Sequence, residues 1–311
     1  MDRTAVVAIG GNALSPAGEA ATVANQFRHT RESLAPIVEF ACQGWNIAVV
    51  HGNGPQVGDE LVRNEKARDA LPELPLGVLV ASTAGWIGYM IQQSLQNALV
   101  RAGARRNVVT LMTQVLVEPT HASVLEPRKF IGRAIDEELA RSLRRQGMRV
   151  ERDGHGNLRR KVASPEPLEI VEAPVIAHLV ARGDIVIAAG GGGSPVSWAK
   201  GGLEGIDAVV DKDLAASILA QAIGASCLMI LTDVDGVYRD YGGPAARRIE
   251  RLNAAEARQL LAGEELGIGS MRPKLEAAAD FVESGGERAV IAALADAAAA
   301  AKGRAGTLIV S

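Results

Sequence analysis

Short runs of β-branched and other apolar residues recur along the chain, and each run ends in glycines or in a polar turn. Four runs, at residues 4–9, 46–50, 185–189 and 228–231, precede Gly10-Gly11-Asn12, His51-Gly52-Asn53-Gly54-Pro55, a glycine run at 190–193 and Thr232-Asp233-Val234-Asp235-Gly236. A helix-like segment is expected after each turn. Near-continuous apolar strands that alternate with helices are typical of a parallel sheet covered on both faces. The pattern therefore predicts an α/β fold.

The glycine turns fall where ligands bind in this fold class, outside the carboxyl ends of the strands. Turns at 10–11, 52–54 and 190–193 let backbone amides approach phosphate oxygens without interference from a Cβ, with helix N-termini behind them. Three such turns on one side favour an anion site. The alternative is a set of tight turns that bind nothing.

The pattern changes between residues 118 and 167, where apolar strands give way to prolines. Residues 136–145 predict a charged helix, and residues 149–162 predict a hairpin that turns at 153–157. Residues 126–162 hold eleven Lys or Arg against six Asp or Glu, a net charge of +5. We expect a small inserted subdomain, whose basic character fits either a solvated surface or a flap that closes over an anionic substrate.

Composition narrows the range of partners. The chain has 311 residues, 48% hydrophobic and 3% aromatic, so a large core of aliphatic side chains is expected. The net charge of −3 favours neither a nucleic-acid nor a membrane-surface partner. Cys42 and Cys227 lie far apart and are expected to be buried, reduced thiols, which favours a cytoplasmic setting.

Two lysines stand at expected helix starts. Lys212 opens an Ala- and Leu-rich helix over residues 214–223, and Lys274 follows Pro273, which suits the first turn of a helix that runs to about residue 284. A cation is unfavourable beside the partial positive charge of a helix N-terminus, so Lys212 suggests an anionic ligand. The alternatives are neutralisation of Lys212 by its aspartate neighbours and a surface position for Lys274.

Other chemistries fit badly. The sequence has no phosphate loop of the type Gly-x-x-x-x-Gly-Lys-Ser/Thr, no Gly-x-Gly-x-x-Gly fingerprint, no His-Glu-x-x-His and no Gly-x-Ser-x-Gly elbow. Its five histidines are scattered, which argues against a His-based triad and against a metal site held by the protein.

Taken in order, these turns and lysines resemble carbamate kinases, which are members of the amino acid kinase family. The resemblance covers nearly the whole chain and is carried by six motifs: Ala8-Ile9-Gly10-Gly11-Asn12-Ala13-Leu14, His51-Gly52-Asn53-Gly54-Pro55-Gln56-Val57-Gly58, the 190–193 glycines with Pro195-Val196, Val210-Asp211-Lys212-Asp213-Leu214, Leu231-Thr232-Asp233-Val234-Asp235-Gly236-Val237-Tyr238 and Gly269-Ser270-Met271-Arg272-Pro273-Lys274.

The resemblance implies an open αβα sandwich with a mostly parallel central sheet. It implies an acceptor-substrate lobe at residues 1–117 and 168–205, a protruding subdomain at 118–167 and a nucleotide-binding lobe at 206–311. The implied reaction is carbamoyl phosphate + ADP = ATP + carbamate, with Mg²⁺. The implied assembly is a homodimer that binds small molecules, without nucleic acid or membrane.

Site residues follow from the same resemblance. Lys212 and Lys274 would grip the transferring phosphoryl group, Asp213 would orient them, and Lys129 would reach the substrate from the subdomain. The acceptor side would be bound by Gly10, Gly11, Asn12, Gly52, Asn53, Gly191 and Gly192. The nucleotide would contact Lys212 and Lys274 together with Thr232, Asp233, Val234, Asp235, Tyr238 and Met271.

Departures from the family pattern fall on the substrate side. The chain reads Lys129-Phe130-Ile131-Gly132-Arg133-Ala134 where the family usually has Lys-Pro-Ile-Gly-Pro-Phe, and Thr83-Ala84-Gly85 where it usually has Ser or Thr followed by Gln-Gly. Two alternatives therefore stay open: a kinase of this fold for another small carboxylate-like anion, and a nucleotide-binding regulatory protein without turnover. Intact Lys212, Asp213 and Lys274 argue against the second.

Overall fold

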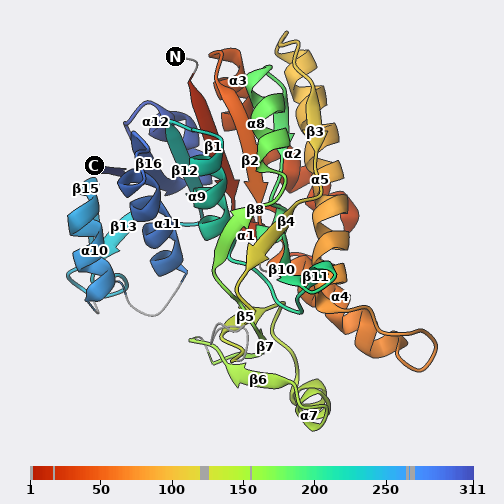
Figure 1. Cartoon of the computed structure of the whole chain (residues 1–311). Helices are drawn as coiled ribbons and strands as arrows, with labels where there is room; N and C mark the ends of the chain where they lie inside the picture. Colours follow the sequence, from red (N-terminus) through yellow and green to blue (C-terminus); the bar gives the residue numbers. More distant parts are fainter. Residues whose placement is uncertain (1–2, 17, 120–125, 155, 264–265, 267–269) are drawn as a thin grey trace.

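An eight-stranded sheet forms the centre of the protein, in the order β15-β17-β16-β12-β1-β2-β9-β3 (Figure 1). The computed structural model describes residues 3–16, 18–119, 126–154, 156–263, 266 and 270–311. Neighbouring strands of this sheet pair in parallel, apart from the antiparallel pair β16 and β17. The predicted fold class is confirmed. The strands are β1 (Thr4–Ile9), β2 (Asn46–His51), β3 (Val108–Thr110), β9 (Ile185–Ile187), β12 (Cys227–Thr232), β15 (Arg251–Asn253), β16 (Arg288–Ala293) and β17 (Thr307–Val310).

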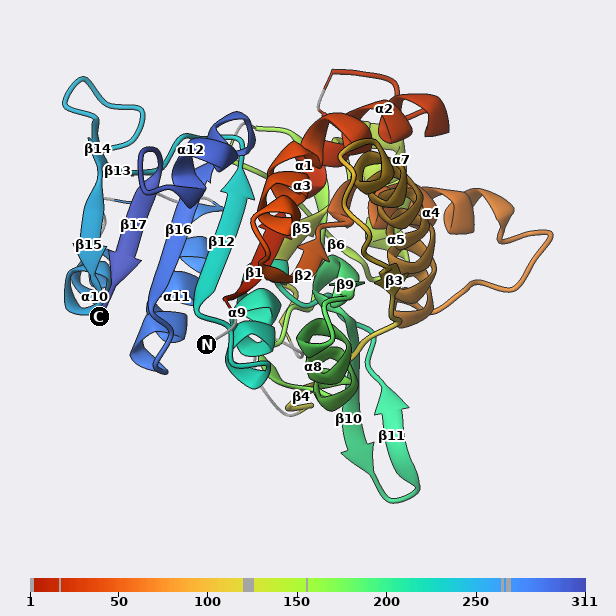
Figure 2. The ribbon, with the colours of Figure 1, turned by 90° about the horizontal axis from the view of Figure 1, so that it is seen from above.

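Helices cover both faces of this sheet (Figure 2). Alternate residues of β1 enter different cores, with Val6 and Ala8 on one face and Ala5, Val7 and Ile9 on the other, and all five are fully buried. Burial on both faces is why the strands read as apolar runs rather than as alternating ones. The first core packs under α8 (Ala173–Ala181), α9 (Lys212–Ala222), α10 (Ala254–Ala262) and α11 (Met271–Glu283); the second packs under α1 (Gly11–Leu14), α2 (Val23–Ser33), α3 (Ala35–Cys42), α5 (Leu76–Arg101), η2 (Leu294–Asp296) and α12 (Ala297–Ala301).

The expected helix is missing after two of the four turns. The glycine run forms a short turn, η1 (Gly190–Gly192), and leads into a strand, while residues 232–236 lead into a hairpin of β13 (Val237–Arg239) and β14 (Arg247–Ile249). Gly191, Gly192 and Gly193 have φ of +69°, +96° and +84°, which a right-handed helix cannot accommodate. The strand after the glycines belongs to a second sheet, in the order β11-β10-β4-β8, built from β4 (Gln114–Val117), β8 (Pro167–Ile170), β10 (Ser194–Ala199) and β11 (Gly202–Gly205).

The inserted subdomain lies beyond the carboxyl ends of β1 and β2 (Figure 1). It contains β5 (Lys129–Ile131), α7 (Glu137–Arg145), β6 (Arg149–Arg152) and β7 (Leu158–Val162), with strand order β5-β7-β6. A small core of Ala140, Leu143, Val150 and Leu158 holds α7 on the hairpin. The predicted charged helix and hairpin are confirmed, although residue 155 at the hairpin turn and residues 120–125 lie outside the described ranges.

One prediction about the cysteines is wrong. Cys227 is buried in β12, but Cys42, the last residue of α3, is exposed, because the buried face of this helix is formed by Pro36, Ile37, Phe40 and Ala41. None of the helices in the described ranges combines the length and the apolar character that a membrane crossing requires.

Candidate active site

A cavity of about 260 Å³ opens at the carboxyl edge of β1, β2 and β12. Its walls come from the turns after these strands, from the start of α9 and from the inserted subdomain. The lining residues are Gly10, Gly11, Asn12, Gly52, Asn53, Gly54, Pro55, Lys129, Phe130, Ile131, Gly191, Val209, Val210, Asp211, Lys212, Asp213, Thr232, Asp233, Ser270 and Lys274.

Glycines let the turns of this cavity pack backbone against backbone. A Cβ on Gly52 would lie 2.6 Å from the Gly11 amide nitrogen, and a Cβ on Gly191 would lie 2.1 Å from Asn53 Nδ2. Any larger residue would therefore force these turns apart. The Asn53 side chain is fixed from the other side, where its Nδ2 donates to Thr83 Oγ1 at 3.0 Å. Thr83 belongs to the Thr83-Ala84-Gly85 segment, which differs from the family pattern, and it holds the predicted site residue Asn53 in place.

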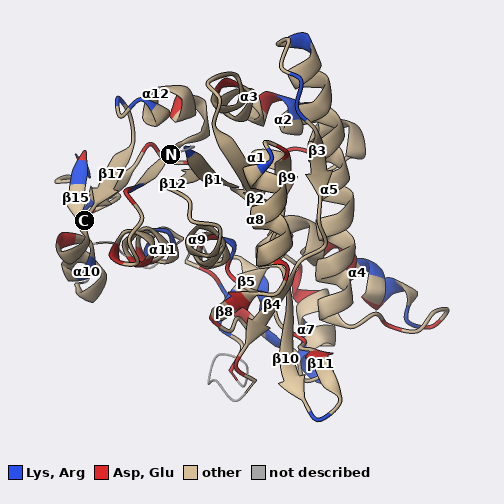
Figure 3. Ribbon diagram, turned by 45° about the horizontal axis from the view of Figure 1, so that its top comes forward, with Lys and Arg blue, Asp and Glu red and all other residues tan. Residues whose placement is uncertain are grey.

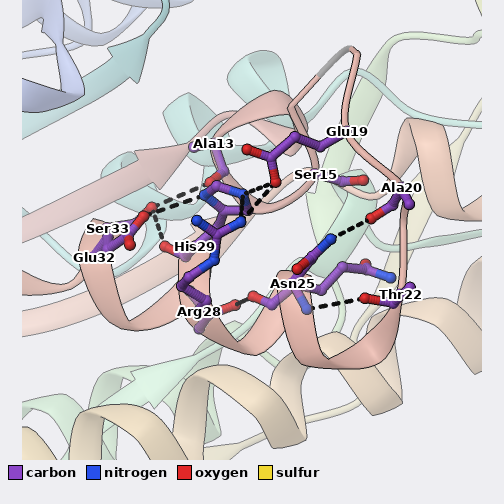
Figure 4. Close-up of polar contacts among 12 residues, drawn as sticks. Ala13, Ser15, Glu19, Ala20, Thr22, Asn25, Arg28, His29, Glu32 and Ser33 are labelled. Carbon is purple, nitrogen blue, oxygen red and sulfur yellow. Dashed lines mark hydrogen bonds and ion pairs between the residues drawn. The ribbon is translucent and has the colours of Figure 1, made fainter.

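The short helix α1 supplies Gly11 and Asn12 and is supported from behind by α2 (Figure 4). Ser33 on α2 donates its hydroxyl to the Ala13 carbonyl at 3.3 Å, and Thr22 caps α2 by accepting from the Asn25 amide at 3.2 Å. On the cavity side, Asn12 Nδ2 donates to Asp233 Oδ2 at 2.8 Å. This bond joins the turn after β1 to the turn after β12.

Lysines and aspartates form the polar centre of the cavity. Asp213, with 3% of its side chain exposed, accepts from Lys212 through Oδ1 and from Lys274 through Oδ2, the second at 2.9 Å. Asp211 caps α9 by accepting from the Asp213 amide at 2.9 Å, and its other oxygen pairs with Lys129 Nζ at 2.8 Å. Three ammonium groups therefore share two carboxylates, and a third carboxylate, Asp233, also lines the cavity.

Comparison with known proteins shows which family this chain belongs to. Residues 3–293 match the model of the amino acid kinase family. The chain belongs to the amino acid kinase family. It is 41% identical over 312 residues to a carbamate kinase of Pyrococcus furiosus, with 99% of each chain covered. Carbamate kinase of Giardia lamblia superposes with a TM-score of 0.93 when bound to citric acid and 0.91 when bound to AMP-PNP, at 35% and 36% identity, each covering 99% of this chain and 98% of the other. The predicted resemblance is confirmed.

Electrostatics distinguish the two lysines that share Asp213 in this amino acid kinase. Burial lowers the pKa of Lys212, and the attraction of Asp213 does not restore it. Burial also disfavours the ammonium of Lys274, but Asp213 and Asp211 outweigh that effect and raise its pKa. For Asp211, burial favours the neutral acid, yet Lys129 and the other lysines hold the pKa of the carboxyl well below its usual range. The surroundings therefore favour the charged forms of Lys274 and Asp211 and disfavour the charged form of Lys212.

Most residues predicted for the amino acid kinase site line one cavity, and five do not. The twelve that line it are Gly10, Gly11, Asn12, Gly52, Asn53, Lys129, Gly191, Lys212, Asp213, Thr232, Asp233 and Lys274. The five outside are Gly192, Val234, Asp235, Tyr238 and Met271, and their roles stay predictions. Tyr238 donates its hydroxyl to Asp235 Oδ1 at 2.8 Å, and its ring packs edge-on against Tyr241. Gly269, which opens one of the six motifs, lies outside the described residues.

Asp211 is the main site residue that the sequence reasoning missed. The sequence suggests Asp211 only as a neighbour that neutralises Lys212, whereas in the structure it caps α9 and pairs with Lys129, which lies in another part of the chain. An aspartate just before an Ala-rich helix is a strong N-cap signal, so the capping role was visible in the sequence. The pairing with Lys129 was not visible in the sequence, because 82 residues separate Asp211 from Lys129.

Two larger cavities of about 480 and 560 Å³ adjoin the subdomain, and neither contains the lysine and aspartate cluster.

Proposed function

We propose that this protein transfers a phosphoryl group reversibly between ATP and carbamate, in the reaction carbamoyl phosphate + ADP = ATP + carbamate. The observation that carries the proposal is the Lys212–Asp213–Lys274 bridge, which faces the glycine turns at 10–12 and 52–54 across one cavity. The Pyrococcus furiosus and Giardia lamblia relatives are both carbamate kinases, which supports the acceptor, and the AMP-PNP complex of the Giardia lamblia enzyme supports the nucleotide.

The chemistry needs no general base, because carbamate is already an oxyanion. The difficulty is to bring this anion against a triphosphate and to stabilise charge on the transferring group. Lys212 and Lys274 supply that charge at fixed positions, since Asp213 holds both ammonium groups and prevents them from moving apart. The backbone amides of the turns at 10–12 and 52–54 bind the acceptor side, and residues near 232–238 and 271 contact the nucleotide.

Mg²⁺ enters this proposal as part of the nucleotide substrate. Within the described ranges, the His, Cys, Asp and Glu side chains form no cluster of three or more that could hold a metal ion. The nearby carboxylates have other partners, because Asp211 and Asp213 pair with lysines and Asp233 accepts from Asn12. Mg²⁺ is commonly bound through substrate phosphates with few protein ligands, which suits such a site.

Arg133 was one reason to consider another acceptor. Its Nη2 donates to Ser15 Oγ at 2.9 Å and its Nε lies 3.6 Å from Asp59 Oδ1, and it does not line the cavity. It therefore adds no charge to the acceptor side, and this weakens the alternative of a different carboxylate-like substrate.

We further propose the division into an acceptor lobe, an inserted subdomain and a nucleotide lobe, together with a cytoplasmic location.

We also propose a homodimer that associates through α5. This helix carries no Asp, Glu, Lys or Arg from residue 76 to residue 100, and Figure 3 shows it uncharged over most of its length. Tyr89 on α5 and Met112 beside it are 56% and 47% exposed, which suits a protein contact better than solvent. Asn97→Arg would place like charges opposite each other across a two-fold axis. We expect light scattering to report a monomer for this variant and a dimer for Val175→Arg, a control on exposed α8.

One assay tests the activity. Purified protein with ADP, Mg²⁺ and carbamoyl phosphate should form ATP, measured by a coupled luminescent reaction. Acetyl phosphate serves as the matched control, because it offers the same phosphoryl group on a different carboxyl acceptor. If ATP formed from acetyl phosphate but not from carbamoyl phosphate, the acceptor would be a carboxylate other than carbamate. Formation from neither donor, with ADP still bound, would favour a regulatory protein without turnover.

A further inference from the structure

Lys129 is the one cation that the described part of the inserted subdomain contributes to the cavity, and little backbone structure fixes it. It begins β5, a strand of only three residues that pairs with β7 alone. Its ammonium must nevertheless reach Asp211 at 2.8 Å on the main body of the protein. A strand this short needs side-chain contacts to hold its register and direction.

Ile131 anchors the far end of β5 in a core with Val57 and Val162, and the contacts next to Lys129 come from Phe130. Its ring lies 5.0 Å from Lys161 Nζ and 5.8 Å from Arg159 Cζ, both on β7, and Lys161 is the direct cross-strand partner of Phe130. Lys161 is in turn fixed by Glu151 on β6, at 2.6 Å. Two cations within about 6 Å of one ring centroid are within the range of favourable cation–π contact. Phe130 thus ties β5 through β7 to β6.

We infer that Phe130 is a positioning residue for Lys129, and that its contacts with Lys161 and Arg159 set how well the subdomain holds the anionic substrate. The inference rests on the proposed function for its substrate. Phe130 should influence the Michaelis constant for carbamoyl phosphate more than turnover or ADP binding, and because Phe130 itself also lines the cavity, this effect must depend on Lys129. The residues that contact the transferring group, Lys212 and Lys274, are left untouched.

Substitutions at the ring and at its cations separate this role from a general packing role. Phe130→Leu keeps an apolar side chain but loses both cation–π contacts, and we expect the KM for carbamoyl phosphate to rise about five- to tenfold. Phe130→Trp keeps an aromatic face and should stay within about twofold of the wild type. Lys161→Met should raise the KM about threefold, because one of the two contacts remains.

Arg152→Met is the matched control. It also removes one positive charge from the subdomain, but Arg152 pairs with Glu137 and contacts neither Phe130 nor the cavity. If Lys161→Met acted only by weakening the electrostatic attraction of the substrate, Arg152→Met would have the same effect. We expect its KM to match that of the wild type. Equal effects of the two variants would contradict the inference.

A double-mutant cycle with Lys129→Ala provides the decisive test. If Phe130 acts through Lys129, Phe130→Leu should raise the KM in the wild-type background and have no further effect in the Lys129→Ala background. The same fold-change in both backgrounds would overturn the inference. The proposed function is tested apart from this by the wild-type assay. If the wild-type protein forms no ATP, hydrogen exchange of the backbone amides of residues 129–131 tests the positioning role instead. We expect these amides to exchange faster in Phe130→Leu than in Phe130→Trp. Equal exchange in the two variants would refute the positioning role.

Discussion

Asp213→Asn is the perturbation that most directly tests how the lysine cluster is held together. Asparagine has the same shape as aspartate but carries no charge. In the wild type, the buried Asp213 carboxylate pairs with both Lys212 and Lys274, whose side chains are 12% and 8% exposed. In the variant, two buried ammonium groups would face each other, with Asp211 and Asp233 as the remaining carboxylates nearby. Removal of one partner from a buried ion pair costs about 3–5 kcal/mol of folding free energy.

The protonation of Lys212 sets an upper limit to this cost. A lysine that becomes too unfavourable as a cation loses its proton, which at pH 7 costs about 4.6 kcal/mol from an ordinary pKa of about 10.4. Burial already lowers the pKa of Lys212, so Lys212 is the group expected to become neutral. Its folded pKa would then lie below the unfolded value, and the stability of the variant would rise with pH by about 1.4 kcal/mol per unit. The deficit relative to the wild type should therefore shrink between pH 7 and pH 9.

Urea unfolding of the variant and the wild type at pH 7, 8 and 9 measures both quantities. The Asp213→Asn/Lys212→Met double variant is the internal control, because it removes the uncompensated charge and replaces it by an apolar chain of similar length. It should recover most of the stability lost in the single variant, while ATP formation stays at least about 100-fold down in both. The reasoning would be refuted by a single variant as stable as the wild type, or by a double variant no more stable than the single one.

Three further predictions concern separate parts of the site. Lys212→Ala should lower turnover at least about 100-fold with folding intact. The control Lys200→Ala, on the exposed β10–β11 hairpin, should not lower turnover. If Lys212→Ala kept half of the wild-type turnover, Lys212 would have no part in the mechanism. Gly11→Val should abolish acceptor-phosphate binding and leave ADP binding in place, because a Cβ at Gly11 already lies 3.2 Å from Pro55 Cδ. Calorimetry that shows equal losses of affinity for both ligands would contradict separate acceptor and nucleotide sides of the site. Burial lowers the pKa of His51 to about 4, so folding should lose about 3 kcal/mol as the pH falls from 6.5 to 4, and His51→Gln should flatten that slope in urea titrations.

The sequence predicted those parts of the fold that depend on local pattern. Apolar runs identified β1, β2, β9 and β12 to within two residues at each end, and Pro273 and the Asp-Lys-Asp triplet marked the starts of α11 and α9. These signals work because strand burial and helix capping depend on neighbouring residues. The glycine run at 190–193 misled for the opposite reason. Glycine permits a positive φ without requiring it, so the sequence did not reveal that this turn leads into a strand.

Long-range pairing was beyond the reach of the sequence. The bonds from Asn12 to Asp233 and from Asn53 to Thr83 join segments separated by 221 and 30 residues. Periodicity could place these side chains at one edge of the sheet, but it could not choose partners among them. The family resemblance predicted the roles of Lys212, Asp213 and Lys274, and the structure adds that each Asp213 oxygen pairs with one of the two lysines.

The charge balance of the cavity explains how the protein tolerates three lysines in one poorly solvated place. Lys129, Lys212 and Lys274 share the cavity with Asp211, Asp213 and Asp233, so its lining carries as many carboxylates as ammonium groups. Asp211 and Asp213 pair with the lysines directly, whereas Asp233 accepts from Asn12 and attracts Lys274 from a greater distance. This pairing reduces the cost of burying the charges. An anionic phosphoryl group must therefore compete with the carboxylates for the lysines, and a further carboxylate in the cavity would weaken its binding.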